Sequence, residues 1–299
     1  TRRHVLAVID RLGYRPSGIA RGLATQRTNT LGLVVPDIAN PFFADVARGA
    51  EDTAYAEGYN VFVYNTDESP QRELAALQAM EEQRVDGLVL CSSRLAGDVL
   101  RAALDRHPAA VLVNCRLENV QVGRVLLADE EGGRAATAHL VHAGHRAVGF
   151  LAGPLASFSS GQRAAGYRAA LEDAGLRTNP AWVRPCSYQV ASGRGAASEL
   201  LAEHPEVTAL FCYNDLVAVG TLQACAELGR RVPDDVAVVG FDDIPMAAVV
   251  TPALTTCRVP RYEVGQRAMQ LLLGRTMGDS DADEEIVFEP ELVIRASAP

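Results

Sequence analysis

Lysine is absent from this sequence, and all 28 basic side chains are arginines, which we ascribe to the base composition of the gene rather than to function. Long apolar runs are absent as well. A helix that spans a bilayer needs about 18 consecutive apolar residues or more. No such run occurs, so we expect no transmembrane segment and no membrane partner. The N-terminus does not resemble a signal peptide either, because Asp10 and Arg11 interrupt the short apolar stretch from Val5 to Ile9.

Cysteine pairs of the kind that bind zinc are also missing. The six cysteines, Cys91, Cys115, Cys186, Cys212, Cys225 and Cys257, are scattered without a C-x-x-C spacing. Most of them lie in or beside apolar runs, which is typical of buried free thiols in a reducing compartment. We therefore expect a cytoplasmic protein with no metal site and no cofactor.

The composition is that of a folded chain with a sizeable core. The sequence has 299 residues, of which 48% are hydrophobic and 22% charged, and this length favours two domains. The net charge of −9 is unevenly spread, since residues 1–27 carry six arginines against Asp10 alone. That segment is therefore +5 and the remainder −14. A basic arm on an acidic body suggests contact with a polyanion, although a chance cluster on a solvated helix explains the charge equally well.

Short apolar strands alternate with helices along nearly the whole chain. We predict strands at Leu31–Pro36, Tyr59–Tyr64, Gly87–Cys91, Ala110–Asn114, Ala147–Ala152, 182–186, 207–212, 236–241 and 286–294. This alternation is typical of parallel sheets covered by helices on both faces. Roughly ten strands exceed what one ordinary sheet needs. The predicted fold class is therefore α/β, with two doubly wound parallel-sheet lobes in tandem.

The basic arm contains two candidate helices. Thr1 can cap a first helix, and Ser17 can cap a second, short helix that carries Ala20 and Leu23. The second helix is too short and too rich in glycine to be stable alone. Either a partner chain or DNA orders it, or the segment is a frayed tail.

Polar and aromatic side chains follow four of the predicted strands, where open α/β sheets bind their ligands. These side chains are Asp37, Asn40, Phe42 and Phe43 after the first strand, Asn114 and Arg116 after the fourth, Tyr213 to Asp215 after the strand at 207–212, and Asp242 and Asp243 after the strand at 236–241. Each can have a structural role, as a helix cap, a core residue or a turn residue. Their convergence nevertheless predicts a polar pocket for a neutral ligand.

Eight motifs in order resemble the lactose-repressor (LacI) family of transcriptional regulators. They are NPFF, VDGLVL, HLVHAGHR, FLAGP, RAAGY, CYND, VVGFDD and TPALTT, and the closing ELVIRAS is similar too. The stretch TRRHVLAVIDRLGYRPSGIARGLA resembles the third headpiece helix and the hinge helix of that family. The resemblance implies a two-lobed core like that of periplasmic sugar receptors, with three chain crossovers. The family's helix-turn-helix lies further upstream, so we expect a truncated form that binds operator DNA weakly or not at all.

The resemblance also divides the chain. Residues 1–27 correspond to the remnant of the DNA-binding headpiece and hinge. Residues 28–128 plus 260–286 correspond to the N-terminal lobe of the effector-binding core. Residues 129–259 plus 287–299 correspond to the C-terminal lobe.

Position by position, the resemblance implies effector contacts at Phe42, Asn114, Ser157, Ser159, Arg163, Tyr188, Asn214 and Asp242. Many relatives place an aspartate where Ala128 stands, and Asp129, which follows it, is included for that reason. The hinge residues Ser17, Ala20, Arg21 and Leu23 match the DNA-contacting segment, with Leu23 as the apolar wedge in the minor groove.

No enzyme signature competes with this interpretation. The sequence has no phosphate-binding glycine loop and no G-x-S-x-G elbow. His139, His142 and His145 are interpreted as surface or capping residues, and the adjacent carboxylates Asp242 and Asp243 should point apart. We therefore expect a non-enzymatic repressor, a homodimer that changes its affinity for operator DNA when a sugar binds. A purine- or nucleoside-responsive repressor and a sugar-transport receptor are the alternatives, and the sign of the ligand effect stays open.

Overall fold

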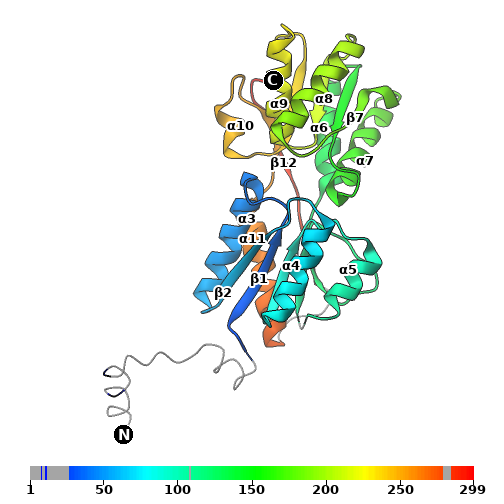
Figure 1. Cartoon of the computed structure of the whole chain (residues 1–299). Helices are drawn as coiled ribbons and strands as arrows, with labels where there is room; N and C mark the ends of the chain where they lie inside the picture. Colours follow the sequence, from blue (N-terminus) through cyan, green and yellow to red (C-terminus); the bar gives the residue numbers. More distant parts are fainter. Residues whose placement is uncertain (1–7, 9–10, 12–26, 108, 279–283) are drawn as a thin grey trace.

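The computed structural model describes residues 8, 11, 27–107, 109–278 and 284–299, which form two α/β lobes (Figure 1). The predicted DNA-contacting residues of the hinge, Ser17, Ala20, Arg21 and Leu23, lie outside the described residues. Within the described ranges, no helix is long and apolar enough to cross a membrane.

The first lobe is built on a six-stranded parallel sheet. Its order is β11-β5-β4-β3-β1-β2, with β1 (Thr30–Val35), β2 (Asn60–Asn65), β3 (Gly87–Cys91), β4 (Ala110–Val113), β5 (Gly123–Leu127) and β11 (Glu285–Phe288). One face is covered by α3 (Pro41–Ala56) and α11 (Arg261–Met277), and the other by α4 (Pro70–Glu82) and α5 (Gly97–Leu104). Asn40 caps α3 as its sequence predicts, with Oδ1 accepting from Phe42 N at 3.0 Å.

The second lobe repeats this plan. Its sheet has the order β12-β10-β9-β8-β6-β7, with β6 (Val148–Ala152), β7 (Val183–Pro185), β8 (Ala209–Cys212), β9 (Ala237–Asp242), β10 (Thr255–Arg258) and β12 (Glu291–Val293). The helices α6 (Asp129–His142) and α7 (Phe158–Asp173) cover one face, and α8 (Val190–Glu203) and α9 (Asp215–Glu227) the other. The short helix α10 (Pro245–Val249) and a 3-10 turn (Pro180–Trp182) complete the lobe.

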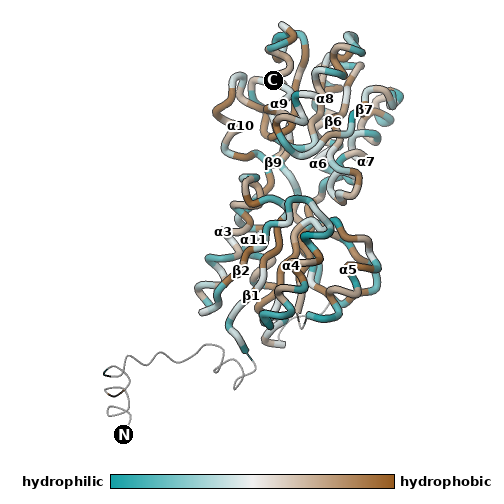
Figure 2. Tube along the Cα trace, in the orientation of Figure 1, coloured by the Kyte–Doolittle hydropathy of each residue, from teal (hydrophilic) through white to brown (hydrophobic). Residues whose placement is uncertain are grey.

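The chain passes between the lobes three times, after β5, after β10 and after β11. The strands that form the centre of both sheets are buried along their whole length, as sheets covered on both faces require. In Figure 2 teal, hydrophilic residues gather in the loops and on the outer helix faces, and brown, hydrophobic residues lie between them. The six cysteines are free, and all but Cys186 are buried, as expected.

Three details of the predicted fold are wrong. The strands β5 and β10 were not predicted. The single strand expected near 286–294 is two strands in different sheets, because Pro290 separates β11 from β12 and cannot donate to a ladder. β12 also pairs antiparallel with β10, in an otherwise parallel sheet. The predicted passage to the second lobe at residue 287 therefore falls inside β11, which continues to Phe288 in the first sheet.

Candidate ligand-binding site

The carboxyl ends of the two sheets face each other across a cavity of about 30 Å³. Its walls are formed by Asn40, Phe42, Phe43, Glu68, Ser92, Arg94, Asn114, Ser159, Arg163, Tyr188, Tyr213, Asn214 and Asp242. Seven of the nine sequence-predicted effector contacts are among these residues. The other two, Ser157 and Asp129, are buried behind the wall and hydrogen-bond to residues in it.

Three of the strand ends have an uncommon backbone conformation. Ser92 after β3 and Asn114 after β4 have φ of 48°, and Asp242 at the end of β9 has φ of 110°. A positive φ is rare for residues with a side chain and recurs at functional sites, where the surrounding structure enforces it. At each of these strand ends a polar side chain borders the cavity.

Arg163 reaches the cavity because α6 and α7 cross in close contact. A Cβ atom on Gly133 would lie 2.6 Å from the carbonyl oxygen of Arg163, and one on Gly166 would lie 2.0 Å from that of Glu130. Only glycine allows the two backbones to approach so closely. The crossing sets Arg163 of α7 beside Asp129, the first residue of α6.

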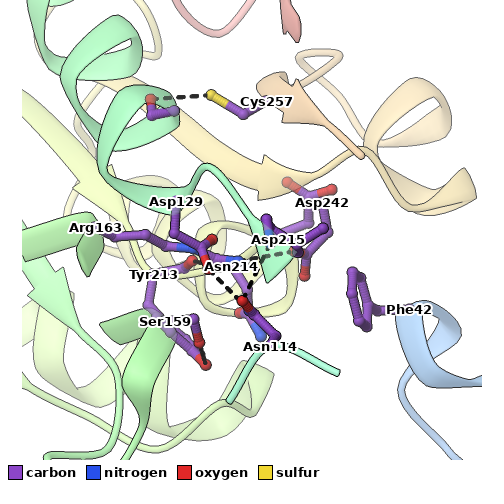
Figure 3. A network of polar contacts seen from close by, with 12 residues as sticks. Phe42, Asn114, Asp129, Ser159, Arg163, Tyr213, Asn214, Asp215, Asp242 and Cys257 are labelled. Carbon is purple, nitrogen blue, oxygen red and sulfur yellow. Dashed lines mark hydrogen bonds and ion pairs between the residues drawn. The ribbon is translucent and has the colours of Figure 1, made fainter. Parts of the chain in front are cut away.

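The guanidinium of Arg163 is fixed on several sides (Figure 3). Its Nε donates to Asp129 Oδ1 at 2.8 Å, and its Nη1 donates to the carbonyl oxygen of Tyr213 at 2.6 Å. Its Cζ lies 3.6 Å from the ring centroid of Phe241, a cation–π arrangement. Nη2 is 3.6 Å from Asp242 Oδ1, which is close enough for an ion pair but too far for a hydrogen bond. This last group is therefore available to a ligand.

Asp129 links Arg163 to the other lobe. Its second oxygen accepts from Asn114 Nδ2 at 2.8 Å, and Asn114 belongs to the first lobe. The Asp129 side chain is 0% exposed, so its structural position is that of a residue that orients Arg163 and Asn114. The sequence analysis predicts that Asp129 contacts the ligand directly, but Asp129 does not line the cavity.

The electrostatics of the site are dominated by burial. Burial raises the pKa of Asp242 to about 7, against the opposing effect of Arg163. Burial also raises the pKa of Asp215 well above its usual value, and the nearby Asp242 carboxylate adds to this. Burial alone would lower the pKa of Arg163, but the carboxylates of Asp129 and Asp242 raise it above its ordinary value. Arg163 therefore stays charged, while Asp242 can change its charge near neutral pH.

The first lobe contributes a second arginine that the sequence analysis did not predict. Arg94 forms an ion pair with Glu68, with Nη2 donating to Oε1 at 3.0 Å, and its Nη1 donates to the carbonyl oxygen of Ser92 at 2.8 Å. The Arg94 backbone N–H donates to Glu73, a buried carboxyl whose pKa is raised by burial. Arg94 lies three residues beyond the end of β3 and borders the cavity.

Asn214 caps a helix and also borders the cavity. Its Oδ1 caps α9 by accepting from Val217 N at 2.9 Å, and its Nδ2 donates to the carbonyl oxygen of Tyr188 at 3.2 Å. The Tyr188 hydroxyl donates in turn to Asp67 of the first lobe at 3.4 Å. The predicted aromatic wall at Tyr188 thus also joins the two lobes.

The histidine cluster lies away from the cavity. His139 Nε2 is 2.9 Å from the carbonyl oxygen of Ala298, and His145 Nδ1 is 2.9 Å from Thr208 Oγ1. Asp243 turns away from the cavity to Arg258 and Arg295. No group of three or more metal-ligating side chains occurs in the described part of the chain.

Known proteins share this architecture. The family described as periplasmic binding proteins and sugar binding domain of LacI family matches residues 28–287. The chain is 33% identical over 302 residues to the HTH-type transcriptional repressor PurR of Aliivibrio fischeri (strain ATCC 700601 / ES114), covering 99% of this chain and 89% of the relative. It is 34% identical over 295 residues to catabolite control protein A of Priestia megaterium, covering 98% and 88%.

Solved structures agree with the sequence relatives. The transcriptional regulator CelR in complex with cellobiose superposes with a TM-score of 0.84 at 31% identity, over 99% of this chain and 90% of that one. The transcription regulator CcpA of Lactococcus lactis superposes with a TM-score of 0.83 at 27% identity, over 90% and 99%.

Proposed function

Because this chain belongs to the LacI family of transcriptional regulators, we propose that its interlobe cavity binds a sugar and that binding changes the affinity of the protein for operator DNA. The observation that carries the proposal is the environment of Arg163. Its Nη2 group faces the cavity opposite Asp242, with Asn114 and Ser159 in the same wall. Donors and acceptors of this kind pair with neighbouring hydroxyl groups, which both accept and donate.

The charges around the cavity favour a neutral ligand. Arg163 is balanced by Asp129 and Asp242, and Arg94 by Glu68. The aromatic rings of Phe42, Phe43 and Tyr188 can cover the apolar faces of a sugar ring. One solved relative is described as bound to cellobiose and another as bound to ribose.

A purine or nucleoside is the second candidate. The same aromatic rings could stack on a base, and several sequence relatives carry the name PurR. The sugar is favoured because the cavity wall combines carboxylate, amide and hydroxyl groups that bind several hydroxyls at once.

Ligand binding requires the lobes or their side chains to move apart. A cavity of about 30 Å³ holds no more than a few water molecules, whereas ligand pockets measure about 300 Å³ or more. Direct bonds hold the lobes at this separation. They are Asn114 to Asp129, Tyr188 to Asp67, and Arg261 Nη1 to the carbonyl oxygen of Asp242 at 2.6 Å. A ligand that replaces such bonds changes the relative position of the lobes.

The residues that follow the basic arm, Thr28 and Asn29, are bound to the first lobe. Asp86 accepts from the backbone N–H of Thr28 and of Asn29, both at 2.8 Å, and from the Thr28 hydroxyl at 3.0 Å. These bonds attach the residues that follow the arm to the first lobe, so the arm is expected to move with that lobe when the two lobes rearrange. We propose that the arm contacts operator DNA through Ser17, Ala20, Arg21 and Leu23 in a homodimer, and that the protein acts in the cytoplasm and not as an enzyme. The coupling is reciprocal, so a ligand that weakens DNA binding is bound less well by the DNA complex.

A thermal-shift screen against mono- and disaccharides, sugar phosphates and purines tests the proposed effector. A ligand that binds only the folded state adds about 2.7 kcal/mol at a hundredfold excess over its dissociation constant. Stabilisation by one group of sugars supports the proposal. Stabilisation by purines alone replaces the sugar with a base, and no stabilisation by any compound contradicts both.

A further inference from the structure

We propose that Tyr213 is a specificity-determining residue that selects a ligand with a free hydroxyl group beside Arg163. This inference rests on the proposed function, because it specifies which hydroxyl group of the proposed sugar ligand the second lobe recognises. Tyr213 follows β8 directly and borders the cavity together with Ser159 and Arg163. Its role follows from the arrangement of the hydroxyl groups around it.

Three hydroxyl groups form a closed ring at this end of the cavity. Tyr213 Oη lies 3.2 Å from Ser157 Oγ and 3.1 Å from Ser159 Oγ, and the two serine oxygens are 2.9 Å apart. All three residues are buried. Each hydroxyl has one proton to donate. A ring in which each group donates to the next therefore uses every proton that the three residues have.

The hydroxyl ring offers acceptors to the cavity rather than donors. Ser157 Oγ also accepts from the backbone N–H of Ser160 at 3.3 Å as the cap of α7, and Ser157 does not border the cavity. Ser159 and Tyr213 do border it, and each keeps an acceptor lone pair. The end of the cavity beside Arg163 therefore accepts hydrogen bonds through these two oxygens.

Arg163 has the opposite character, because a guanidinium only donates. Its Cζ lies 5.0 Å from the centroid of the Tyr213 ring, so the guanidinium donor lies beside the ring that carries the acceptor hydroxyl. One ligand hydroxyl between them can accept from Arg163 and donate to Tyr213 or Ser159. A carbonyl oxygen or an unprotonated ring nitrogen can only accept, and an N–H group can only donate. A hydroxyl satisfies both neighbours through a single atom.

The Tyr213 ring has little room to move away from this position. A Cβ atom on Gly153 would lie 2.5 Å from Cδ2 of Tyr213, so the ring lies directly on the backbone at the end of β6. The Cζ atom of Arg163 is 5.0 Å from the ring centroid. These two contacts restrict the Tyr213 ring and therefore the position of its hydroxyl group. Figure 3 shows Tyr213 beside Arg163 and Ser159.

Calorimetric titration of the wild type and of Tyr213→Phe tests the inference. The ligands are D-glucose, D-galactose and D-ribose, their monodeoxy analogues, and the purines adenine and hypoxanthine. For the sugar that binds the wild type, we expect Tyr213→Phe to weaken binding roughly tenfold, the effect of one hydrogen bond. One deoxy analogue, which lacks the hydroxyl beside Arg163, should bind both proteins equally. The matched control is Tyr167→Phe, because Tyr167 Oη donates to Val148 O at 2.8 Å in the same lobe without bordering the cavity. Its sugar affinity should equal that of the wild type.

Two results overturn the inference while a sugar still binds the wild type. One is unchanged affinity of Tyr213→Phe for every sugar, and the other is an equal loss toward the parent sugar and all of its deoxy analogues. Binding of adenine or hypoxanthine alone, or of none of these compounds, refutes the proposed sugar effector and this inference with it. Should Tyr213→Phe not fold, Ser159→Ala removes another cavity-facing member of the hydroxyl ring and should give the same pattern.

Discussion

Arg163 and Asp129 form a buried ion pair between α7 and α6, with 2.8 Å between Nε and Oδ1 and side-chain exposures of 4% and 0%. The pair has a second consequence beyond orienting Arg163, because Asp129 also accepts from Asn114 of the other lobe. Ligand recognition, lobe contact and the stability of the second lobe therefore depend on the same residues. This dependence means that variants of the site must be designed so that binding and folding are measured separately.

We predict that Arg163→Met destabilises the protein by about 3–5 kcal/mol, since it leaves the Asp129 carboxylate buried without its partner. The double variant Arg163→Met with Asp129→Asn should recover most of that stability, because neither side chain is then charged. Urea unfolding followed by circular dichroism measures both effects. Equal stability of the single and double variants would show that the ion pair does not hold α6 and α7 together.

The close crossing of α6 and α7 gives a second prediction. Gly133→Ala should cost about 1–3 kcal/mol and weaken ligand binding, because the new Cβ would meet the Arg163 backbone and displace the guanidinium. Gly161→Ala is the matched control, since Gly161 lies in α7 with no atom within 4 Å of a Cβ placed there. The control should gain about 0.5–1 kcal/mol from helix propensity alone. Similar stability and ligand affinity of the two variants would contradict the role of the crossing.

The raised pKa of Asp242, about 7, predicts a pH dependence of stability. Between the ordinary value of 3.8 and about 7, the folded protein binds a proton at Asp242 that the unfolded chain has released. The contribution of Asp242 to stability is therefore largest at low pH and decreases as the pH rises through this range. The difference in unfolding free energy between the wild type and Asp242→Asn, measured from pH 5 to pH 8 at constant ionic strength, isolates this contribution. A difference that does not change with pH would show that Asp242 titrates near its ordinary value.

Most of the candidate site could be predicted from strand ends. The carboxyl ends of parallel strands meet at one edge, so Phe42, Asn114, Asn214 and Asp242 were placed correctly around one cavity. Arg94 and Glu68 were not predicted, because they lie in loops whose course no periodicity determines. Tyr213 stood within a motif that was identified, but the hydroxyl ring it closes depends on the packing of its side chain against Gly153.

Near the C-terminus, the local sequence pattern also does not determine where the strands lie in the fold. The apolar stretch from Ile286 to Ile294 has the pattern of one strand, and only the tertiary structure assigns its two halves to different sheets. Pro290 was the available signal for the break.

The hydrogen bonds of Asp86 to Thr28 and Asn29 predict that the neighbouring peptide bond after Arg27 is protected from proteolysis. Asp86→Ala should speed tryptic cleavage after Arg27 several-fold, because the Thr28 N–H loses its acceptor and the segment opens more often. Asp105→Ala is the control, as an exposed carboxylate of the same lobe. Mass spectrometry of timed digests measures the rate. Equal cleavage after Arg27 in the wild type and Asp86→Ala would show that Asp86 does not hold the arm.

Calorimetric titration of the sugars and purines into the wild type and into the Arg163→Met, Asp129→Asn double variant tests whether the ligand binds beside Arg163. We expect one group of sugars to bind the wild type with one site per chain. The double variant should fold with nearly wild-type stability but lose this binding by at least about a hundredfold, roughly 2.7 kcal/mol. A folded double variant that binds the same sugar with wild-type affinity would contradict the placement of the ligand beside Arg163.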